Sequence, residues 1–275
     1  MVIDKSVSVA APSHLTDDAP PSYTMTASSS SSPSASGDYT TMGTRQPPIG
    51  VESANFVQII RTEDSVRGTW VIDPNLVIPA AFLPPLPAGL DSSQRMNLHL
   101  ESKEGCVQGE VYIKPISHEI RSTMKRTSKI LIYAMAKEDK VELRIHDTPI
   151  LHPGDQRLPI HLKAKSKEDN VRIYLPRSFC GPFHISTKSS DRSTVVLSPA
   201  IRERLCTMSQ NLKIRQGFIG RPGHPTQLEG SLDNWDGDML EIEILDSWSD
   251  VKLYFDDEDT KGTQKGGTLR KLFGL

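Results

Sequence analysis

The middle of the chain, from about residue 56 to residue 255, is predicted to fold mainly as β-sheet. Two observations support this prediction: apolar and polar residues alternate along many short segments, and these segments come in pairs around polar turns. In one segment, for example, Val141, Leu143 and Ile145 alternate with polar residues. Because alternate side chains of a strand point to opposite faces, each such segment has one apolar and one wet face.

The paired segments form five strand–turn–strand units of similar size. The units are Leu98–Leu100 with Val107–Ile113, Ile130–Ala136 with Val141–Ile145, Ile160–Ala164 with Val171–Leu175, Phe183–Thr187 with Val195–Leu197, and Met239–Ile244 with Val251–Phe255. We expect the strands to be antiparallel, as is typical of sheets with one wet face. Since a single hairpin is marginally stable, the units must stack, in either a β-sandwich or a short β-solenoid.

One short helix is expected over about residues 199–212. Ser198 can cap it, Pro199 suits its first turn, and apolar residues recur on one face. A second segment, residues 116–124, fits either a helix or a basic loop. Residues 73–91 contain five prolines and are expected to form an ordered, irregular lead-in, because proline cannot donate a hydrogen bond to a strand ladder.

The two ends of the chain differ in composition from its middle. Residues 1–50 contain 17 Ser or Thr, 6 Pro and no aromatic residue besides Tyr23 and Tyr39, so we expect a disordered arm. Residues 256–275 are acidic and then basic, and are expected to form a flexible tail. The predicted β-rich domain is therefore residues 51–255.

Composition excludes several classes of protein. The net charge of −2 gives no electrostatic reason to expect nucleic acid binding. The cysteines Cys106, Cys180 and Cys206 are isolated, so neither a zinc site nor a disulfide framework is indicated. No apolar run suits a signal peptide or a membrane span, and we expect a cytoplasmic protein.

No motif for catalysis is present. The sequence lacks the G-x-S-x-G nucleophile elbow and both glycine-rich phosphate-binding patterns. Cys180 lies near His184, but strand alternation places His184 on the face opposite to Phe183 and Ile185. We therefore predict no catalytic residue, no cofactor and no enzymatic activity.

Two clusters contain residue types that bind metals. His146, Asp147, His152 and Asp155 lie in or beside one loop, with His161 close by, but their spacing matches no zinc template. An ordinary loop is the better interpretation, because prolines interrupt the cluster.

The second cluster is Asp233, Asp236 and Asp238. These carboxylates are out of register with the usual calcium loop, and Trp235 lies among them. We leave calcium binding open here and predict no metal site.

The arm contains one short recognition motif, Pro20-Pro21-Ser22-Tyr23. A P-P-x-Y segment favours an extended conformation that fits the aromatic groove of WW domains, so Pro20, Pro21 and Tyr23 are candidate partner-binding residues. The C-terminal Leu269–Leu275 mixes basic and apolar residues and is interpreted as a frayed end rather than a membrane anchor.

Four blocks of the chain resemble an uncharacterised fungal family of domains of unknown function. They are Gly68-Thr69-Trp70-Val71-Ile72-Asp73-Pro74, Leu175-Pro176-Arg177-Ser178-Phe179-Cys180-Gly181-Pro182, Phe218-Ile219-Gly220 and Trp235-Asp236-Gly237-Asp238. Arg221 stands where this family has an acidic residue. The paired strands also look distantly like bacterial adhesin-type β repeats. The resemblance implies a β-rich domain over about residues 56–255 and assigns no activity.

These observations predict a non-catalytic β-scaffold that mediates protein–protein interaction, in part through the P-P-x-Y segment. The alternative is a ligand- or carbohydrate-binding module, or an enzyme, whose site forms only when distant segments meet in the folded chain.

Overall fold

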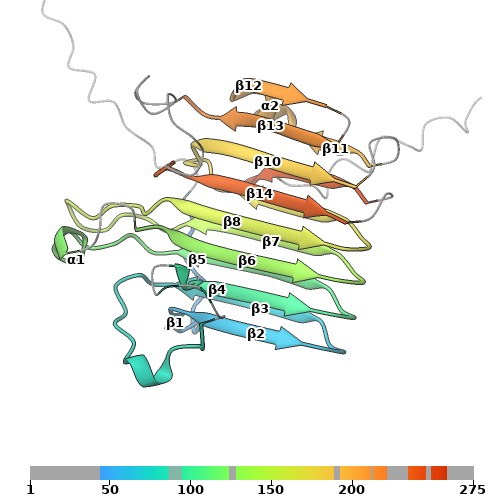
Figure 1. Cartoon of the computed structure of the whole chain (residues 1–275). Coiled ribbons are helices and arrows are strands. Elements are labelled where there is room, and N and C mark those ends of the chain that lie inside the picture. The colour runs from blue at the N-terminus through green and yellow to red at the C-terminus, as the bar shows by residue number, and fades with distance from the viewer. Residues whose placement is uncertain are drawn as a thin grey trace, which may run out of the picture. The chain divides into compact units, whose positions relative to one another are not determined.

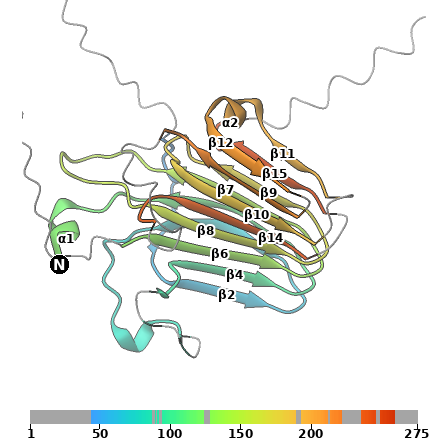
Figure 2. The ribbon, with the colours of Figure 1, turned by 45° about the horizontal axis from the view of Figure 1, so that its top comes forward.

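The described residues of this computed structural model form two β-sheets that face each other (Figures 1 and 2). The structure describes residues 44–86, 89, 91, 94–123, 128–188, 193–211, 213–221, 235–245 and 249–258. The prediction of a mainly β protein is confirmed.

The strands alternate between the two sheets along the chain. Sheet A consists, in spatial order, of β1 (Ser53–Ala54), β3 (Val66–Ile72), β5 (Val107–Ile113), β7 (Val141–Asp147), β9 (Val171–Leu175), β15 (Val251–Phe255) and β11 (Val195–Leu197). Sheet B consists of β12 (Leu205–Gln210), β13 (Ile214–Ile219), β10 (Gly181–Thr187), β14 (Met239–Ile244), β8 (Ile160–Ser166), β6 (Ile130–Ala136), β4 (Leu98–Ser102) and β2 (Val57–Arg61).

The expected antiparallel pairing within each unit is wrong. The two strands of a unit lie in different sheets, and each pairs in parallel with the equivalent strands of neighbouring units. Among the named strands of the described residues, only β12 with β13 and β13 with β10 are antiparallel. Short turns can produce this arrangement because facing sheets lie only about 10 Å apart. The molecule is thus layered like a sandwich and wound like a solenoid, with one unit forming one rung.

The order of the rungs does not follow the order of the chain. The last rung, β14 with β15, lies between the rung of β8 and β9 and the rung of β10 and β11 (Figures 1 and 2). Strand β14 pairs in parallel with both β8 and β10. The final strands therefore enter a position between two rungs that precede them in sequence.

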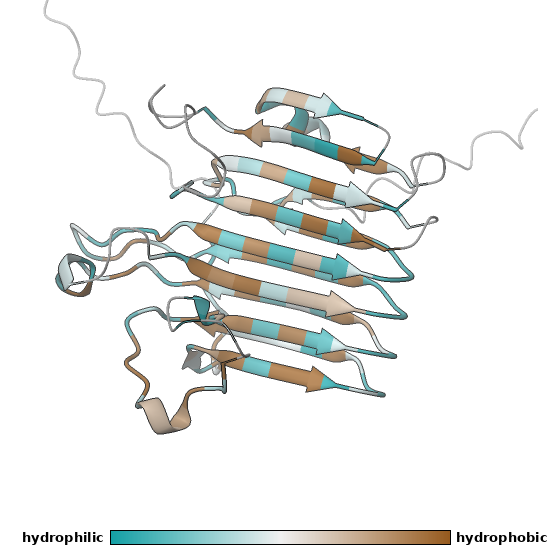
Figure 3. Ribbon diagram, in the orientation of Figure 1, coloured by the Kyte–Doolittle hydropathy of each residue, from teal (hydrophilic) through white to brown (hydrophobic). Residues whose placement is uncertain are grey.

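The core consists of the apolar residues that each strand directs toward the other sheet, which appear as bands along the strands in Figure 3. Equivalent residues stack in register from rung to rung. One row of sheet A contains only valines, namely Val66, Val107, Val141, Val171, Val251 and Val195. Branched side chains stacked in this way fill the interior without large gaps.

The helices are short. Helix α2 (Pro199–Glu203) begins where predicted, with the Ser198 hydroxyl accepting a hydrogen bond from the Ile201 amide, but it ends early because residues 205–210 form β12. The second candidate segment, residues 116–124, contains a short helix, α1 (His118–Thr123). The lead-in contains the 3-10 turn η1 (Ala80–Phe82). No helix among the described residues has the length and apolar character needed to cross a bilayer.

Candidate functional site

Three of the four connections at one edge of the two sheets are long. This long-loop edge carries residues 73–97, 114–129, 148–159 and 176–180, each of which returns the chain from sheet A to sheet B (Figure 1). At the opposite edge the first four turns, residues 62–65, 103–106, 137–140 and 167–170, are short and similar. Binding and catalytic residues often lie on loops held by a rigid scaffold, so a functional site is expected at the long-loop edge.

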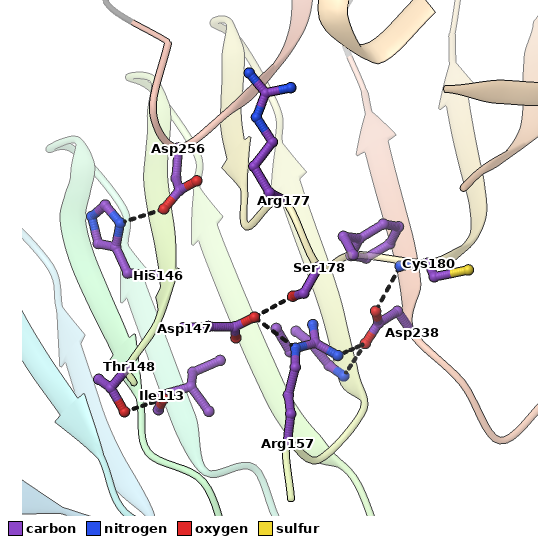
Figure 4. Close-up of polar contacts among 12 residues, drawn as sticks. Ile113, His146, Asp147, Thr148, Arg157, Arg177, Ser178, Cys180, Asp238 and Asp256 are labelled. Carbon is purple, nitrogen blue, oxygen red and sulfur yellow. Dashed lines mark hydrogen bonds and ion pairs between the residues drawn. The ribbon is translucent and has the colours of Figure 1, made fainter. Parts of the chain in front are cut away.

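Asp238 is the centre of a charged cluster at this edge (Figure 4). Its side chain is buried just before β14, and Oδ1 accepts hydrogen bonds from the Ile160 amide and from Arg157 Nη1, both at 2.8 Å. Oδ2 accepts a hydrogen bond from the Cys180 amide at 2.8 Å. Ile160 begins β8 and Cys180 precedes β10. One carboxylate therefore binds the starts of both strands between which β14 lies.

Arg157 joins Asp238 to a second buried carboxylate. Its Nε donates to Asp147 Oδ2 at 2.9 Å, and the Ser178 hydroxyl donates to the same oxygen. Burial raises the pKa of Asp147, although Arg157 and Ser178 act in the opposite direction. Burial also disfavours the charged guanidinium, but the two carboxylates together outweigh burial and raise the pKa of Arg157. The cluster thus contains two carboxylates that share one guanidinium.

A separate acid–base pair lies nearby, on the outer side of sheet A. His146 Nδ1 is 2.8 Å from Asp256 Oδ2, and both side chains are fully buried. The imidazole stacks on Tyr112, with ring centroids 4.6 Å apart, and Arg144 Nη1 donates to the Asp256 carbonyl at 2.6 Å. Nucleophilic catalysis would require a hydroxyl or thiol on this imidazole. The Ser178 hydroxyl instead binds Asp147 (Figure 4).

The sequence candidates for metal binding are dispersed in the structure. Among the residues described, no three His, Cys, Asp or Glu side chains are grouped so that they could hold a metal ion. His146 faces Asp256, Asp147 faces Arg157, and His161 lies on sheet B.

The remaining predicted positions have different outcomes. Asp233 lies outside the described residues, as do Pro20, Pro21 and Tyr23, while Asp238 binds Arg157 and two amides.

The Cys180 thiol donates to the Arg221 carbonyl at 3.3 Å. Burial raises the pKa of this thiol, which disfavours the reactive thiolate. His184 points outward from β10, in register with Glu241 of β14 and Gln216 of β13.

The long-loop edge also contains an open groove of about 970 Å³. It lies between the lead-in segment and the outer face of sheet B, where β6 and β8 begin. Most of its lining is apolar, including Phe56, Val77, Met96, Ile120 and Leu131. Its residues come from parts of the chain that are far apart in sequence.

Polar side chains also line the groove, among them His161 and Lys129. Burial, and next Lys129, lower the pKa of His161 to about 4, so its imidazole is neutral at pH 7. His161 Nε2 is buried and has no hydrogen-bond partner among the described residues. Burial lowers the pKa of Lys129, whose ammonium donates to the Trp235 carbonyl at 2.5 Å.

Basic side chains outnumber acidic ones along the groove. Arg95, Lys129 and Lys163 line it together with one carboxylate, Glu241. Lys163 and Glu241 form an ion pair at 3.0 Å across β8 and β14. Among the lining residues, Arg95 and Lys129 therefore give a positive balance, and the Asp236 carboxylate outside the lining also acts on Lys129.

Three of the four blocks that resemble the family lie close together in the structure, which the sequence did not indicate. The block around Cys180 and Gly181, the block around Phe218 and the block around Asp238 share one corner of the long-loop edge. A Cβ atom on Gly181 would lie 1.8 Å from the Asp238 carbonyl oxygen, so only glycine fits this approach. The role of Arg157 was missed entirely, because nothing around it in sequence marks it.

Comparison with known proteins adds a family but no activity. A family model described as a domain of unknown function (DUF7330) matches residues 55–258, from just before β2 to just after β15. No curated protein matches the chain, and no solved structure matches it. The expectation of an uncharacterised domain family is confirmed.

Proposed function

The chain belongs to the DUF7330 family of domains of unknown function, and from this premise we propose that it is a non-catalytic scaffold that binds partner proteins. We propose that the groove at the long-loop edge receives an extended, apolar segment of the partner with acidic residues beside it. The observation that carries the proposal is this open, mostly apolar hollow with a positive balance of charge.

The shape and lining of the groove support peptide binding. Binding sites are typically concave and apolar, with a small number of polar groups that fix orientation. At the lead-in, Val77 is 89% exposed and Phe82 is 79% exposed. Exposed apolar residues gathered beside a hollow are typical of interaction surfaces. A partner segment that covers Val77 and Phe82 would supply the hydrophobic contribution to binding.

The charged side chains of the groove indicate which kind of partner segment it binds. Arg95 and Lys129 are not matched by carboxylates of the groove itself, since Glu241 pairs with Lys163. A segment flanked by Asp or Glu complements them, and such complementarity contributes specificity and a faster association rate. The neutral His161 adds a hydrogen-bonding group rather than a charge.

The charged clusters support a structural role for the ionisable residues. Asp238, Arg157 and Asp147 bind one another and the starts of strands, and His146 binds Asp256. Buried charges commonly persist when they are paired and hydrogen-bonded in this way. We therefore propose that the chain binds without catalysis.

We further propose that the arm makes a second contact, through Pro20, Pro21 and Tyr23 bound to a WW domain. Tyr23→Ala should abolish binding of a purified WW domain to the full chain, measured by isothermal titration, and Ser22→Ala should leave it intact. Equal binding to wild type and Tyr23→Ala would remove the arm from the proposal. These partners would place the protein in the cytoplasm.

The groove is tested separately with a displayed peptide library selected against the full chain. We expect enriched peptides to combine aliphatic residues with Asp or Glu, and their binding to be measured by fluorescence anisotropy. Val77→Glu should weaken binding about tenfold or more, since it adds a like charge and removes apolar contact. Ile150→Glu is the matched control, because Ile150 is 55% exposed at the same edge but outside the groove. Failure to enrich such peptides, or equal binding by Val77→Glu, would refute the groove as the site.

A further inference from the structure

Strand β12 is a long open edge of sheet B. Five of its six residues are exposed, and among the residues that the structure describes only β13 pairs with it. The edges of sheet A are shorter, because β1 has two residues and β11 has three. The unpaired edge of a strand presents backbone groups ready to pair with another chain.

The composition of β12 does not oppose such pairing. Its sequence, Leu-Cys-Thr-Met-Ser-Gln, contains no charged residue and no proline, the residues that usually protect strand edges. Met208 is 51% exposed although it lies on the core-facing side of the strand, in register with Gly217 and, beyond it, the buried Phe183. The core of the rung stack is therefore incompletely covered at this end.

We propose that two copies of the chain associate through β12, paired antiparallel about a two-fold axis at Met208. Residues opposite each other across an antiparallel pair point to the same side of the sheet, so an axis at a residue keeps the two core faces continuous. Each Met208 then covers the other, and Thr207 of one copy lies opposite Ser209 of the second. Sheet B of one copy and sheet B of the other then form one continuous sheet.

The charges beside β12 do not enter the strand pair. With the axis at Met208, only Cys206–Gln210 of the two copies lie opposite each other, because Glu203 belongs to helix α2 and Lys213 lies in the turn to β13. These five residues carry no charge, so no like charges oppose each other across the pair.

A closed pair is favoured over a head-to-tail chain of molecules. The alternative joins β12 to β2, the other edge of sheet B, and would give open filaments in which the new strand pair is parallel. Antiparallel pairing is slightly more stable per residue than parallel pairing. Strand β2 also ends in Arg61, a charged residue of the protective type.

The β12 edge is separate from the groove. The groove lies over the starts of β6 and β8, whereas β12 is at the end of sheet B farthest from β2. Loss of peptide binding would leave the dimer unaffected.

The test is the mass of the full chain in solution, measured by light scattering and sedimentation over a dilution series. We expect wild type to show the mass of two chains at high concentration. Met208→Lys places two ammonium groups face to face at the axis and should raise the dissociation constant about tenfold or more. Ile60→Lys is the matched control, because Ile60 is 54% exposed on β2 and should not alter the mass.

One spectrum guards against misfolding, and one further variant tests the register. Met208→Lys should keep the far-ultraviolet circular dichroism spectrum of wild type, which a folding defect would change. In a Cys206→Ser background, Met208→Cys should give a disulfide-linked dimer, since opposite Cα atoms of an antiparallel pair lie about 4.5–5.5 Å apart. A monomeric wild type at every concentration, or a dimer dissociated by Ile60→Lys and not by Met208→Lys, would overturn the proposal.

Discussion

The substitution Asp238→Asn tests whether one carboxylate secures the last rung between its two neighbours. Asparagine has nearly the same shape but only one acceptor oxygen and no charge. In the protein the carboxylate accepts hydrogen bonds from the Ile160 and Cys180 amides and from Arg157. The new NH₂ group must face at least one of these donors, and Arg157 loses one of its two charged partners.

The expected cost follows from these contacts. A hydrogen bond to a charged group contributes about 1.5–3 kcal/mol, and removing one partner of a buried ion pair typically costs about 3–5 kcal/mol. Because Asp238 is only 3% exposed, solvent cannot replace the lost interactions. Arg157 retains Asp147, which limits the loss. We therefore expect Asp238→Asn to lower the free energy of unfolding by about 3–5 kcal/mol.

Urea unfolding followed by tryptophan fluorescence measures this change, because the indole of Trp235 donates to the Asp238 carbonyl and reports on the same corner. In a thermal scan the expected loss corresponds to a decrease of about 6–20 °C in Tm for a domain of this size. Asp236→Asn is the control, in the same turn but without these strand contacts, and should change stability by about 0.5 kcal/mol or less. A loss below about 1 kcal/mol in Asp238→Asn would refute the reasoning.

Two further predictions concern a glycine and a histidine. Gly181→Ala should destabilise the fold by about 1–3 kcal/mol or more in the same urea assay, because its Cβ would overlap the Asp238 carbonyl oxygen, whereas wild-type stability would contradict that approach. His161, which faces Lys129, Lys163, Glu241 and Asp238, has a folded pKa of about 4 against about 6.5 when unfolded, so between these values the unfolded chain binds more protons. Its contribution to stability is therefore present above about pH 6.5 and lost as pH falls toward 4. Stability measured across this range should fall less steeply for His161→Gln than for wild type, and parallel curves would refute the assignment.

The positions of most strands could be predicted from sequence. Alternation identified β5, β6, β9, β14 and β15 with the ends that the structure shows. The reason is local: a strand alternates its side chains between two faces, and each apolar face must be buried whichever strand lies beside it. The N-cap at Ser198 is a local feature of the same kind.

Pairing could not be read from alternation, because parallel and antiparallel neighbours bury the same face. The sequence contains one signal of the pairing: the second strand of each unit begins with valine directly after the turn, as in Val107, Val141 and Val171. Identical residues at identical places in successive units are typical of in-register parallel stacking. The structure stacks these valines in one row.

The sites depended on tertiary structure alone. Arg157, Cys180 and Asp238 come from separate loops, and they meet because β14 enters between β8 and β10. The groove likewise combines the lead-in with the faces of β6 and β8. The sequence by itself determined which segments become strands, since that choice rests on residues near one another in the chain. The order of the rungs, the charged cluster and the groove were decided by contacts between distant segments, which a local pattern cannot encode.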